Sequence, residues 1–113
     1  MTTAESSSQV VVVAEGDPVR VSVRGPLDLA SASDLDDAFV SLGSQRPPLV
    51  LLDLAGVTFF DSTGLRALMR VVSRCEEIGT TVRLLNLPSQ TRRVMEMTGT
   101  LDRFEMGEER PGG

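Results

Sequence analysis

The residues with the clearest chemical potential form the segment Asp61-Ser62-Thr63-Gly64, which separates a predicted strand from a predicted helix. In α/β sheets, ligand sites gather outside the carboxyl ends of strands, where helix N-termini present free N–H groups. Ser62 stands at the predicted N-cap, where its hydroxyl can cap the helix at a gain of about 1 kcal/mol. The same exposed hydroxyl can instead accept a phosphate, which adds roughly −1.5 to −2 charges at neutral pH. Composition alone leaves both roles open.

Missing residue types exclude several classes of catalysis. The 113 residues include no His, Lys, Trp or Tyr, all 11 basic residues are Arg, and Cys75 is the single cysteine. Histidine-dependent nucleophiles, Schiff-base and P-loop lysines, zinc sites and an internal disulfide are therefore excluded. A hydrolase that uses Asp28, Asp53 and Asp61 stays an alternative, although no local spacing brings two of these carboxylates together. We expect a protein that is not an enzyme, with no catalytic residue, metal or cofactor.

Charge and hydropathy restrict the partners and the compartment. The net charge of −5 at pH 7 offers no basic excess for binding nucleic acid. No apolar run approaches the roughly 18 residues that would cross a bilayer, and the polar N-terminus lacks the pattern of a signal peptide. We therefore expect a cytoplasmic protein with a disordered leader (1–8), one domain (9–106) and a flexible tail (107–113). The oligomeric state is left open.

Hydrophobic periodicity predicts the order β-β-α-β-α-β-α. The expected elements are strands at 10–13 and 19–24, a helix with N-cap candidates in 31–34, a strand at 49–54, a helix after residue 64, a strand at 82–87 and a helix from Ser89. Gly25-Pro26 is expected to end the second strand, and the three helices are expected to end at Gly43, Gly79 and Gly99.

This order predicts the fold class, which is α/β. Strands joined through helices pair in parallel by right-handed crossovers, and an opening hairpin with its turn at 15–18 adds an antiparallel pair. We therefore expect a mixed sheet of about four to five strands with three or more packed helices. The continuous apolar run at 49–54 suits a central strand that is covered on both faces. Val94 and Met97 are expected to be the apolar residues of the last helix, and Leu101 and Phe104 to cap the core.

The segment 51–65, LLDLAGVTFFDSTGL, resembles the signature of STAS domains, specifically those of the bacterial anti-sigma-factor antagonists. The sequence Gly-Pro-Leu-Asp at 25–28 matches the family's Gly-x-Leu-Asp step, and Met-Thr-Gly at 97–99 followed by Leu101 matches its late Thr/Ser-Gly-Leu region. The resemblance runs from about residue 10 to residue 104 and implies a single STAS-type domain. The sequence departs from the family pattern in two places. Pro26 stands where many relatives have an acidic or polar residue. The sequence also ends soon after Phe104, without the final amphipathic helix that is common in the family.

The resemblance implies a regulatory switch. In this family, the serine that matches Ser62 is phosphorylated by a partner anti-sigma factor, which is itself an ATP-dependent serine kinase. The unphosphorylated antagonist binds that anti-sigma factor and frees the sigma factor, and a serine phosphatase resets the switch. The alternative from another class is a STAS subunit of a membrane transporter complex, which would act as a protein–protein adaptor.

The expected partner-binding residues are Asp28, Asp61, Ser62, Thr63, Gly64 and Arg66. Several of them also have a structural interpretation. Asp28 can cap or brace a turn, Thr63 is either a weaker second phosphoacceptor or a helix-start residue, and Arg66 belongs to a stripe with Arg70 and Arg74 that suits a solvated face. Asp53 is expected to be a hydrogen-bonded structural group, and Cys75 a small buried hydrophobe.

Overall fold

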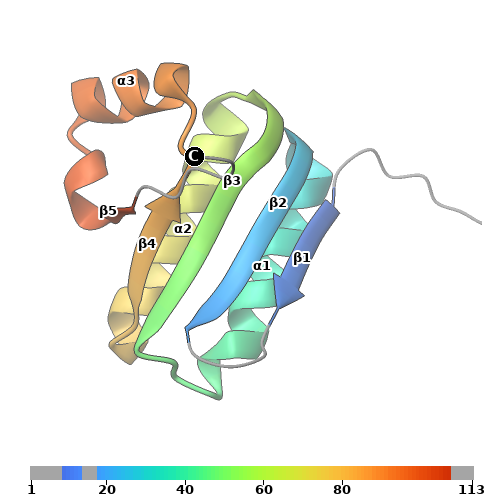
Figure 1. The fold of residues 1–113 in the computed structure, drawn as a ribbon, viewed down its shortest axis with the longest axis vertical. Helices are drawn as coiled ribbons and strands as arrows, with labels where there is room; N and C mark the ends of the chain where they lie inside the picture. The colour runs from blue at the N-terminus through green and yellow to red at the C-terminus, as the bar shows by residue number, and fades with distance from the viewer. Residues whose placement is uncertain (1–8, 14–17, 108–113) are drawn as a thin grey trace, which may run out of the picture.

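The described residues, 9–13 and 18–107 of this computed structural model, form a five-stranded sheet in the order β1-β2-β3-β4-β5 (Figure 1). The elements are β1 (Gln9–Val13), β2 (Val19–Leu27), α1 (Leu29–Gly43), β3 (Leu49–Phe60), α2 (Ser62–Ile78), β4 (Thr81–Leu85), α3 (Ser89–Thr98), the 3-10 turn η1 (Leu101–Arg103) and β5 (Glu105–Gly107). The predicted leader, most of the hairpin turn and the tail beyond Gly107 lie outside the described residues.

Strand pairing confirms the predicted mixed sheet. β1 pairs antiparallel with β2, whereas β2, β3, β4 and β5 pair in parallel. The parallel strands are joined through the helices, as the alternation of strand and helix patterns requires. β5 pairs with β4 at the edge of the sheet, and neither β5 nor η1 is among the predicted elements. Gly107, the first residue of the predicted tail, is the last residue of β5.

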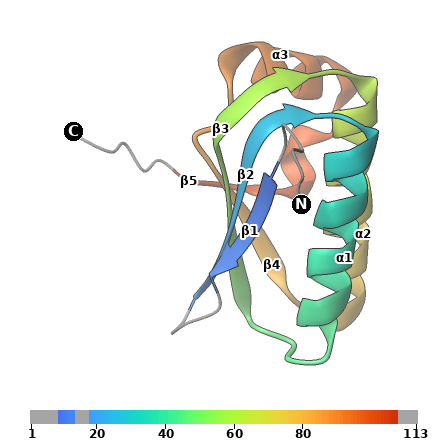
Figure 2. The ribbon, with the colours of Figure 1, turned by 90° about the vertical axis from the view of Figure 1, so that its right-hand side faces the viewer.

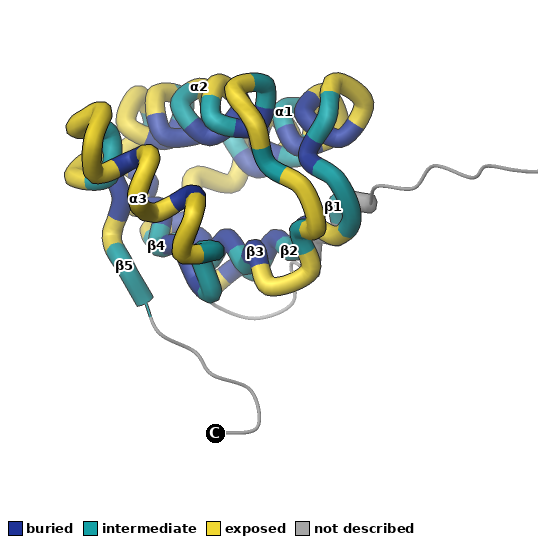
Figure 3. Tube along the Cα trace, turned by 90° about the horizontal axis from the view of Figure 1, so that it is seen from above, coloured by how far each residue is buried: buried dark blue, intermediate teal, exposed yellow. Residues whose placement is uncertain are grey.

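The helices α1 and α2 pack side by side on one face of the sheet (Figure 2). β2 alternates, with Val19, Val21 and Val23 buried, and β3 buries Val50, Leu52 and Leu54 on the same side. The predicted cover on both faces of β3 is therefore wrong, because Leu51 and Asp53 on its other face stay half-buried. Seen from the end of the molecule, the buried residues lie between the two helices and the sheet (Figure 3).

Two helix ends differ from the prediction. The N-cap of α1 is Asp28 rather than a residue within 31–34, because Asp28 and Ser31 form a capping box and the helix begins at Leu29. Gly43 is the last helical residue of α1, not a left-handed residue beyond it. The chain turns back instead at Arg46, which has a φ of 45° and whose backbone N–H bonds the carbonyl of Leu42 at 3.2 Å. Gly79 and Gly99 do cap α2 and α3 in the left-handed conformation, as predicted.

β2 and β3 run further than the prediction. β2 passes through Gly25-Pro26 to Leu27, with register shifts against β3 on both sides of Gly25. Gly25 has a φ of 80°, which a residue without a side chain adopts readily. Among the described residues, pairing with β1 ends at Arg24, so no described strand pairs with Pro26 on that side and its missing N–H is tolerated. The extension carries both strands to the same edge of the sheet.

The core-facing side of α3 does not carry the two apolar residues that the sequence analysis named for this helix. Thr91 and Met95 are buried, whereas Val94 and Met97 are exposed. Thr91 and Met95 are four residues apart and therefore share one helix face. Beyond α3, Phe104 packs into the core as predicted, and Leu101 packs against it.

Candidate functional site

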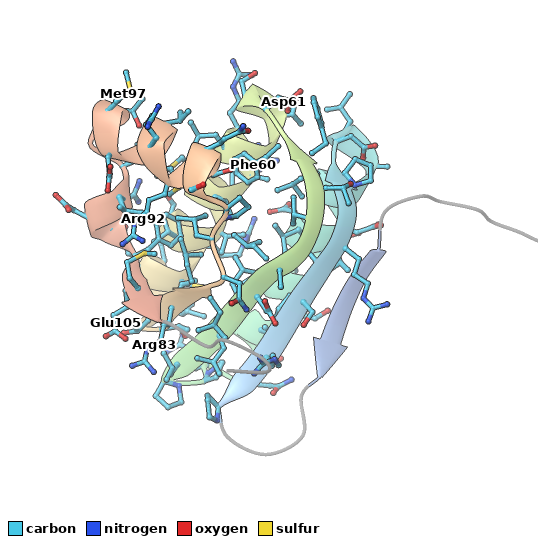
Figure 4. All side chains as sticks on the ribbon, turned by 45° about the horizontal axis from the view of Figure 1, so that its top comes forward. Phe60, Asp61, Arg83, Arg92, Met97 and Glu105 are labelled. Carbon is cyan, nitrogen blue, oxygen red and sulfur yellow. The ribbon has the colours of Figure 1, made fainter. Side chains whose placement is uncertain are left out.

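Two strand-to-helix junctions meet at the carboxyl edge of the sheet. In the parallel ladder, Pro26 pairs with Phe59 and Leu27 with Phe60. Asp28 and Asp61 directly follow these pairs, and neighbouring strands lie about 4.8 Å apart. The N-termini of α1 and α2 therefore open at the same edge, and Figure 4 shows Asp61 at this end of the molecule, with α3 beside it. The partially positive ends of both helices are directed at this surface.

Asp61, not Ser62, caps α2. Its carboxylate accepts hydrogen bonds from the backbone N–H of Thr63 at 2.9 Å and of Gly64 at 3.4 Å. Asp61 has extended backbone angles, and the helix begins at the next residue. The predicted N-cap position of Ser62 is therefore wrong, because the preceding carboxylate already occupies that role.

Ser62 is the first helical residue of α2 and is exposed. Within residues 18–107, no hydrogen-bond partner contacts its hydroxyl. Thr63 follows as the second helical residue and is half-buried. The hydroxyl of Ser62 thus has no capping task and faces solvent beside the Asp61 carboxylate.

Gly64 lets α2 approach β2 closely. A Cβ atom at this position would lie 3.0 Å from Cδ2 and 3.2 Å from Cγ of Leu27, and Leu27 is fully buried. The first turn of α2 therefore rests on the end of β2. This close packing fixes the position of the Ser62 turn relative to the neighbouring junction.

Asp28 caps α1 through a reciprocal pair of bonds with Ser31. The Asp28 carboxylate accepts from the Ser31 backbone N–H at 3.1 Å, and the Ser31 hydroxyl accepts from the Asp28 backbone N–H at 2.9 Å. Ser31 is fully buried and also donates to the carbonyl of Pro26 at 2.8 Å. The backbone hydrogen bond from Ser31 holds the pKa of Asp28 below its ordinary value, so the carboxylate is ionised at neutral pH. The capping interpretation of Asp28 is confirmed.

The arginines of α2 divide between solvent and a helix contact. Arg66, one turn beyond Ser62, and Arg70 are exposed, and within residues 18–107 neither forms an ion pair. Arg74 binds Asp36 of α1 at 3.4 Å and so links the two helices. The predicted solvated stripe therefore holds for Arg66 and Arg70 but not for Arg74.

A mainly apolar groove of about 420 Å³ lies beside Ser62. Its walls come from the end of β3, the start of α2 and the start of α3, and they consist of Val57, Thr58, Phe59, Phe60, Asp61, Ser62, Leu65, Pro88, Gln90, Thr91 and Val94. Phe59 and Val94 are 55% and 48% exposed although they are large and apolar. The sequence pattern assigned no site role to Phe59 and Val94, because only the tertiary position of α3 brings both residues to the same groove.

Exposed apolar side chains concentrate at this edge. The exposed large hydrophobics of the described residues are Leu29, Val40, Phe59, Val94 and Met97. Leu29 begins α1 at the neighbouring junction, and Phe59, one residue before the end of β3, lines the groove together with Val94 of α3. Three of the five therefore lie at this edge, whereas Met97 is near the far end of α3 and is not among the residues that line the groove. Val40 lies near the opposite end of α1. Clustered exposed apolar side chains are typical of protein-binding surfaces.

Asp53 lies far from this edge and has a structural role. It accepts hydrogen bonds from Asn86 at 2.9 Å, from the Ala55 backbone at 3.0 Å and from Arg20 at 3.3 Å. Burial raises the pKa of Asp53, but these three donors outweigh it and leave the pKa below its ordinary value. Asp53 and Asp61 are eight residues apart along an extended chain, roughly 20 Å or more at the usual strand rise. The three aspartates Asp28, Asp53 and Asp61 are therefore not gathered into one catalytic centre.

Cys75 is buried in the core, as predicted. The side chain is 2% exposed, and burial raises its pKa to about 11. The thiol is therefore protonated and unreactive at neutral pH.

In the part of the chain that the structure describes, no helix is long and apolar enough to cross a bilayer.

The sequence matches one family model and resembles several named proteins. The STAS domain model matches residues 9–110. The anti-sigma-F factor antagonist RsfB of Mycobacterium tuberculosis is 31% identical over 102 residues, which cover 88% of this chain and 81% of that protein. The anti-sigma-B factor antagonist of Bacillus subtilis is 28% identical over 95 residues, which cover 84% of this chain and 86% of that protein.

A solved structure agrees with the sequence relatives. An anti-sigma factor antagonist from Mycobacterium paratuberculosis superposes with a TM-score of 0.73 at 27% identity, covering 88% of this chain and 85% of that one. The family model spans every described residue, including the junction that carries Ser62. On these grounds, the chain belongs to the STAS domain family.

Proposed function

We propose that this protein is an anti-sigma-factor antagonist. In its unphosphorylated form it binds an anti-sigma factor through the carboxyl edge of the sheet, so that a sigma factor is released. Phosphorylation of Ser62 by that anti-sigma factor, acting as a serine kinase, ends the binding, and a serine phosphatase restores it. The protein acts in the cytoplasm as a substrate and a docking surface, not as an enzyme.

The observation that carries the proposal is the free hydroxyl of Ser62. The hydroxyl is exposed at the first helical position of α2, while Asp61 does the capping. A kinase can therefore reach and modify the hydroxyl without removing a hydrogen bond that the fold uses. The names of the sequence relatives, which are anti-sigma factor antagonists, support the same role over that of a transporter adaptor.

A phosphate on Ser62 would act mainly through local electrostatics. The N-terminus of α2 and the Arg66 guanidinium one turn along favour negative charge at this position. The Asp61 carboxylate beside it, and that of Asp28 on the adjacent junction, oppose it. Since the helix start tolerates the added charge, we expect the fold to persist while the surface becomes strongly anionic.

The test is phosphotransfer from ATP by each anti-sigma factor of the same bacterium, followed by mass measurement of the intact protein. We expect one phosphate on the wild type and none on Ser62→Ala. Ser89→Ala is the matched control, because Ser89 is also exposed and also the first residue of a helix. Thr63→Ala tests the second hydroxyl of the junction and should be modified like the wild type.

Binding without ATP completes the experiment. Ser62→Asp should weaken the complex with the anti-sigma factor, whereas Ser89→Asp should bind like the wild type. If no anti-sigma factor modifies Ser62 and Ser62→Asp binds as tightly as the wild type, the proposed function is wrong. Phosphorylation of Ser89 in place of Ser62 would also contradict it.

A further inference from the structure

The groove beside Ser62 has walls and a rim of different chemistry. Val57, Phe59, Phe60, Leu65, Pro88 and Val94 supply apolar lining, and the exposed residues Asp61 and Ser62 supply polar lining. Its volume of about 420 Å³ is within the range of pockets that bind compact ligands, and it has room for an aliphatic or aromatic side chain. Phe59 and Val94 keep about half of their surface in contact with water, which a partner would remove.

We propose that this groove receives one apolar side chain of the anti-sigma factor, and that a basic residue of the same segment lies against Asp61 and Asp28. This inference rests on the proposed function and specifies the chemistry of the partner. The occupant is an amphipathic segment with a branched aliphatic or aromatic side chain next to Arg or Lys.

Charge complementarity identifies the basic residue. Asp61 and Asp28 stand on adjacent junctions, and within residues 18–107 neither forms an ion pair with an arginine. Each carboxylate uses one oxygen to cap its helix, since the cap hydrogen bonds of Asp28 and Asp61 all end on Oδ1. The second oxygen of each carboxylate remains for a partner cation, which would be drawn to this edge during encounter.

The groove also explains how a single phosphate on Ser62 would weaken the whole interface with the anti-sigma factor. Ser62 lines the groove, so a phosphate on its hydroxyl would place charge at the entrance. Seating an apolar side chain there would strip water from that charge, which is costly without a compensating partner. The modification would therefore block the anchor directly, with no rearrangement of the backbone.

Two valine substitutions separate the groove from the rest of the surface. Val94 and Val40 are both half-exposed on helices, at 48% and 52%, but only Val94 lines the groove. We expect Val94→Arg to weaken binding of the unphosphorylated protein to its anti-sigma factor by at least about tenfold, and Val40→Arg to change it by less than about twofold. Circular dichroism and the melting temperature of each variant verify the fold, and Val94→Ala supplies a second, milder substitution.

A methyl NMR titration of the wild type gives an independent readout. Addition of the anti-sigma factor should shift the methyl signals of Val57, Leu65 and Val94 while those of Val40 stay in place. Asp61→Asn keeps an oxygen for the cap but removes the charge, so it should weaken binding and reduce its dependence on salt.

The outcomes distinguish the two proposals. If the wild type binds and is phosphorylated on Ser62, but Val94→Arg and Val40→Arg bind alike, the groove inference is wrong and the proposed function stands. Unshifted Val57, Leu65 and Val94 methyl signals in a formed complex would have the same meaning. If the wild type binds no anti-sigma factor, both proposals fail.

Discussion

Removing the Asp61 carboxylate should destabilise the fold, whereas removing the Ser62 hydroxyl should not. Asp61 accepts from the backbone N–H of Thr63 at 2.9 Å and of Gly64 at 3.4 Å, and no other side chain among the described residues caps α2. Asp61→Ala leaves these donors to water, at a cost of about 1 kcal/mol. The lost interaction of the carboxylate with the helix dipole adds about 0.3–1 kcal/mol.

The comparison uses three variants of neighbouring positions. We expect Asp61→Ala to lower the free energy of unfolding by about 1–2 kcal/mol, which corresponds to roughly 4–8 °C or more in Tm for a domain of this size. Asp61→Asn keeps an acceptor and should lose only a few tenths of a kcal/mol. Ser62→Ala should stay within about 0.5 kcal/mol of the wild type.

Urea unfolding followed by far-ultraviolet circular dichroism is the suitable assay, because the chain contains no Trp whose fluorescence could report unfolding. The midpoints should differ while the slope with urea stays constant, which means that stability alone has changed. A loss for Ser62→Ala as large as that for Asp61→Ala would refute the assignment of the cap. It would also mean that phosphorylation of Ser62 disturbs the fold and is not a purely surface event.

Three further predictions concern the packing, the charge network and the thiol. Gly64→Ala should lower the free energy of unfolding by about 1 kcal/mol or more, because overpacking against Leu27 outweighs the gain in helix propensity. Gly43→Ala is its control, since a Cβ at Gly43 meets nothing within 4 Å, and it should raise Tm slightly; equal shifts for both variants would contradict the close contact. Asp53→Asn should destabilise the protein by about 1–2 kcal/mol at neutral pH. Because the folded pKa of Asp53 is lowered, its contribution is present above the unfolded pKa of about 3.9 and is lost as the pH falls through the folded value. Urea unfolding should therefore show the variant approaching the wild type in acid, and a difference that grows in acid would contradict this role. Cys75, with its pKa raised to about 11, should react with a disulfide reagent at mildly alkaline pH only as fast as the protein unfolds, and rapid labelling of the folded protein would show that the thiol is accessible.

Local sequence was sufficient for most elements of the fold. The alternating valines of β2, the apolar core positions of β3 and the glycines after α2 and α3 each have one dominant local interpretation, and the structure agrees with them. The errors at the helix starts occur where two local signals compete. Several candidate caps precede both α1 and α2, and the choice of Asp28 and Asp61 depends on where β2 and β3 end. Those ends depend in turn on the pairing of the two strands.

The amino-acid sequence by itself determined which side-chain chemistries this protein has available and the order of its strands and helices. It excluded histidine and lysine chemistry, and it indicated the junction of β3 and α2 as the candidate site, because residue types and helix-start signals are local properties. Tertiary structure decided that Asp61 caps α2 and that, within residues 18–107, the Ser62 hydroxyl has no hydrogen-bond partner. It also placed Asp28 beside Asp61 through the register of the parallel strands, and it brought Val94 and Phe59 to one groove through the position of α3. These contacts join residues more than thirty positions apart in the sequence, so no periodicity along the chain encodes them.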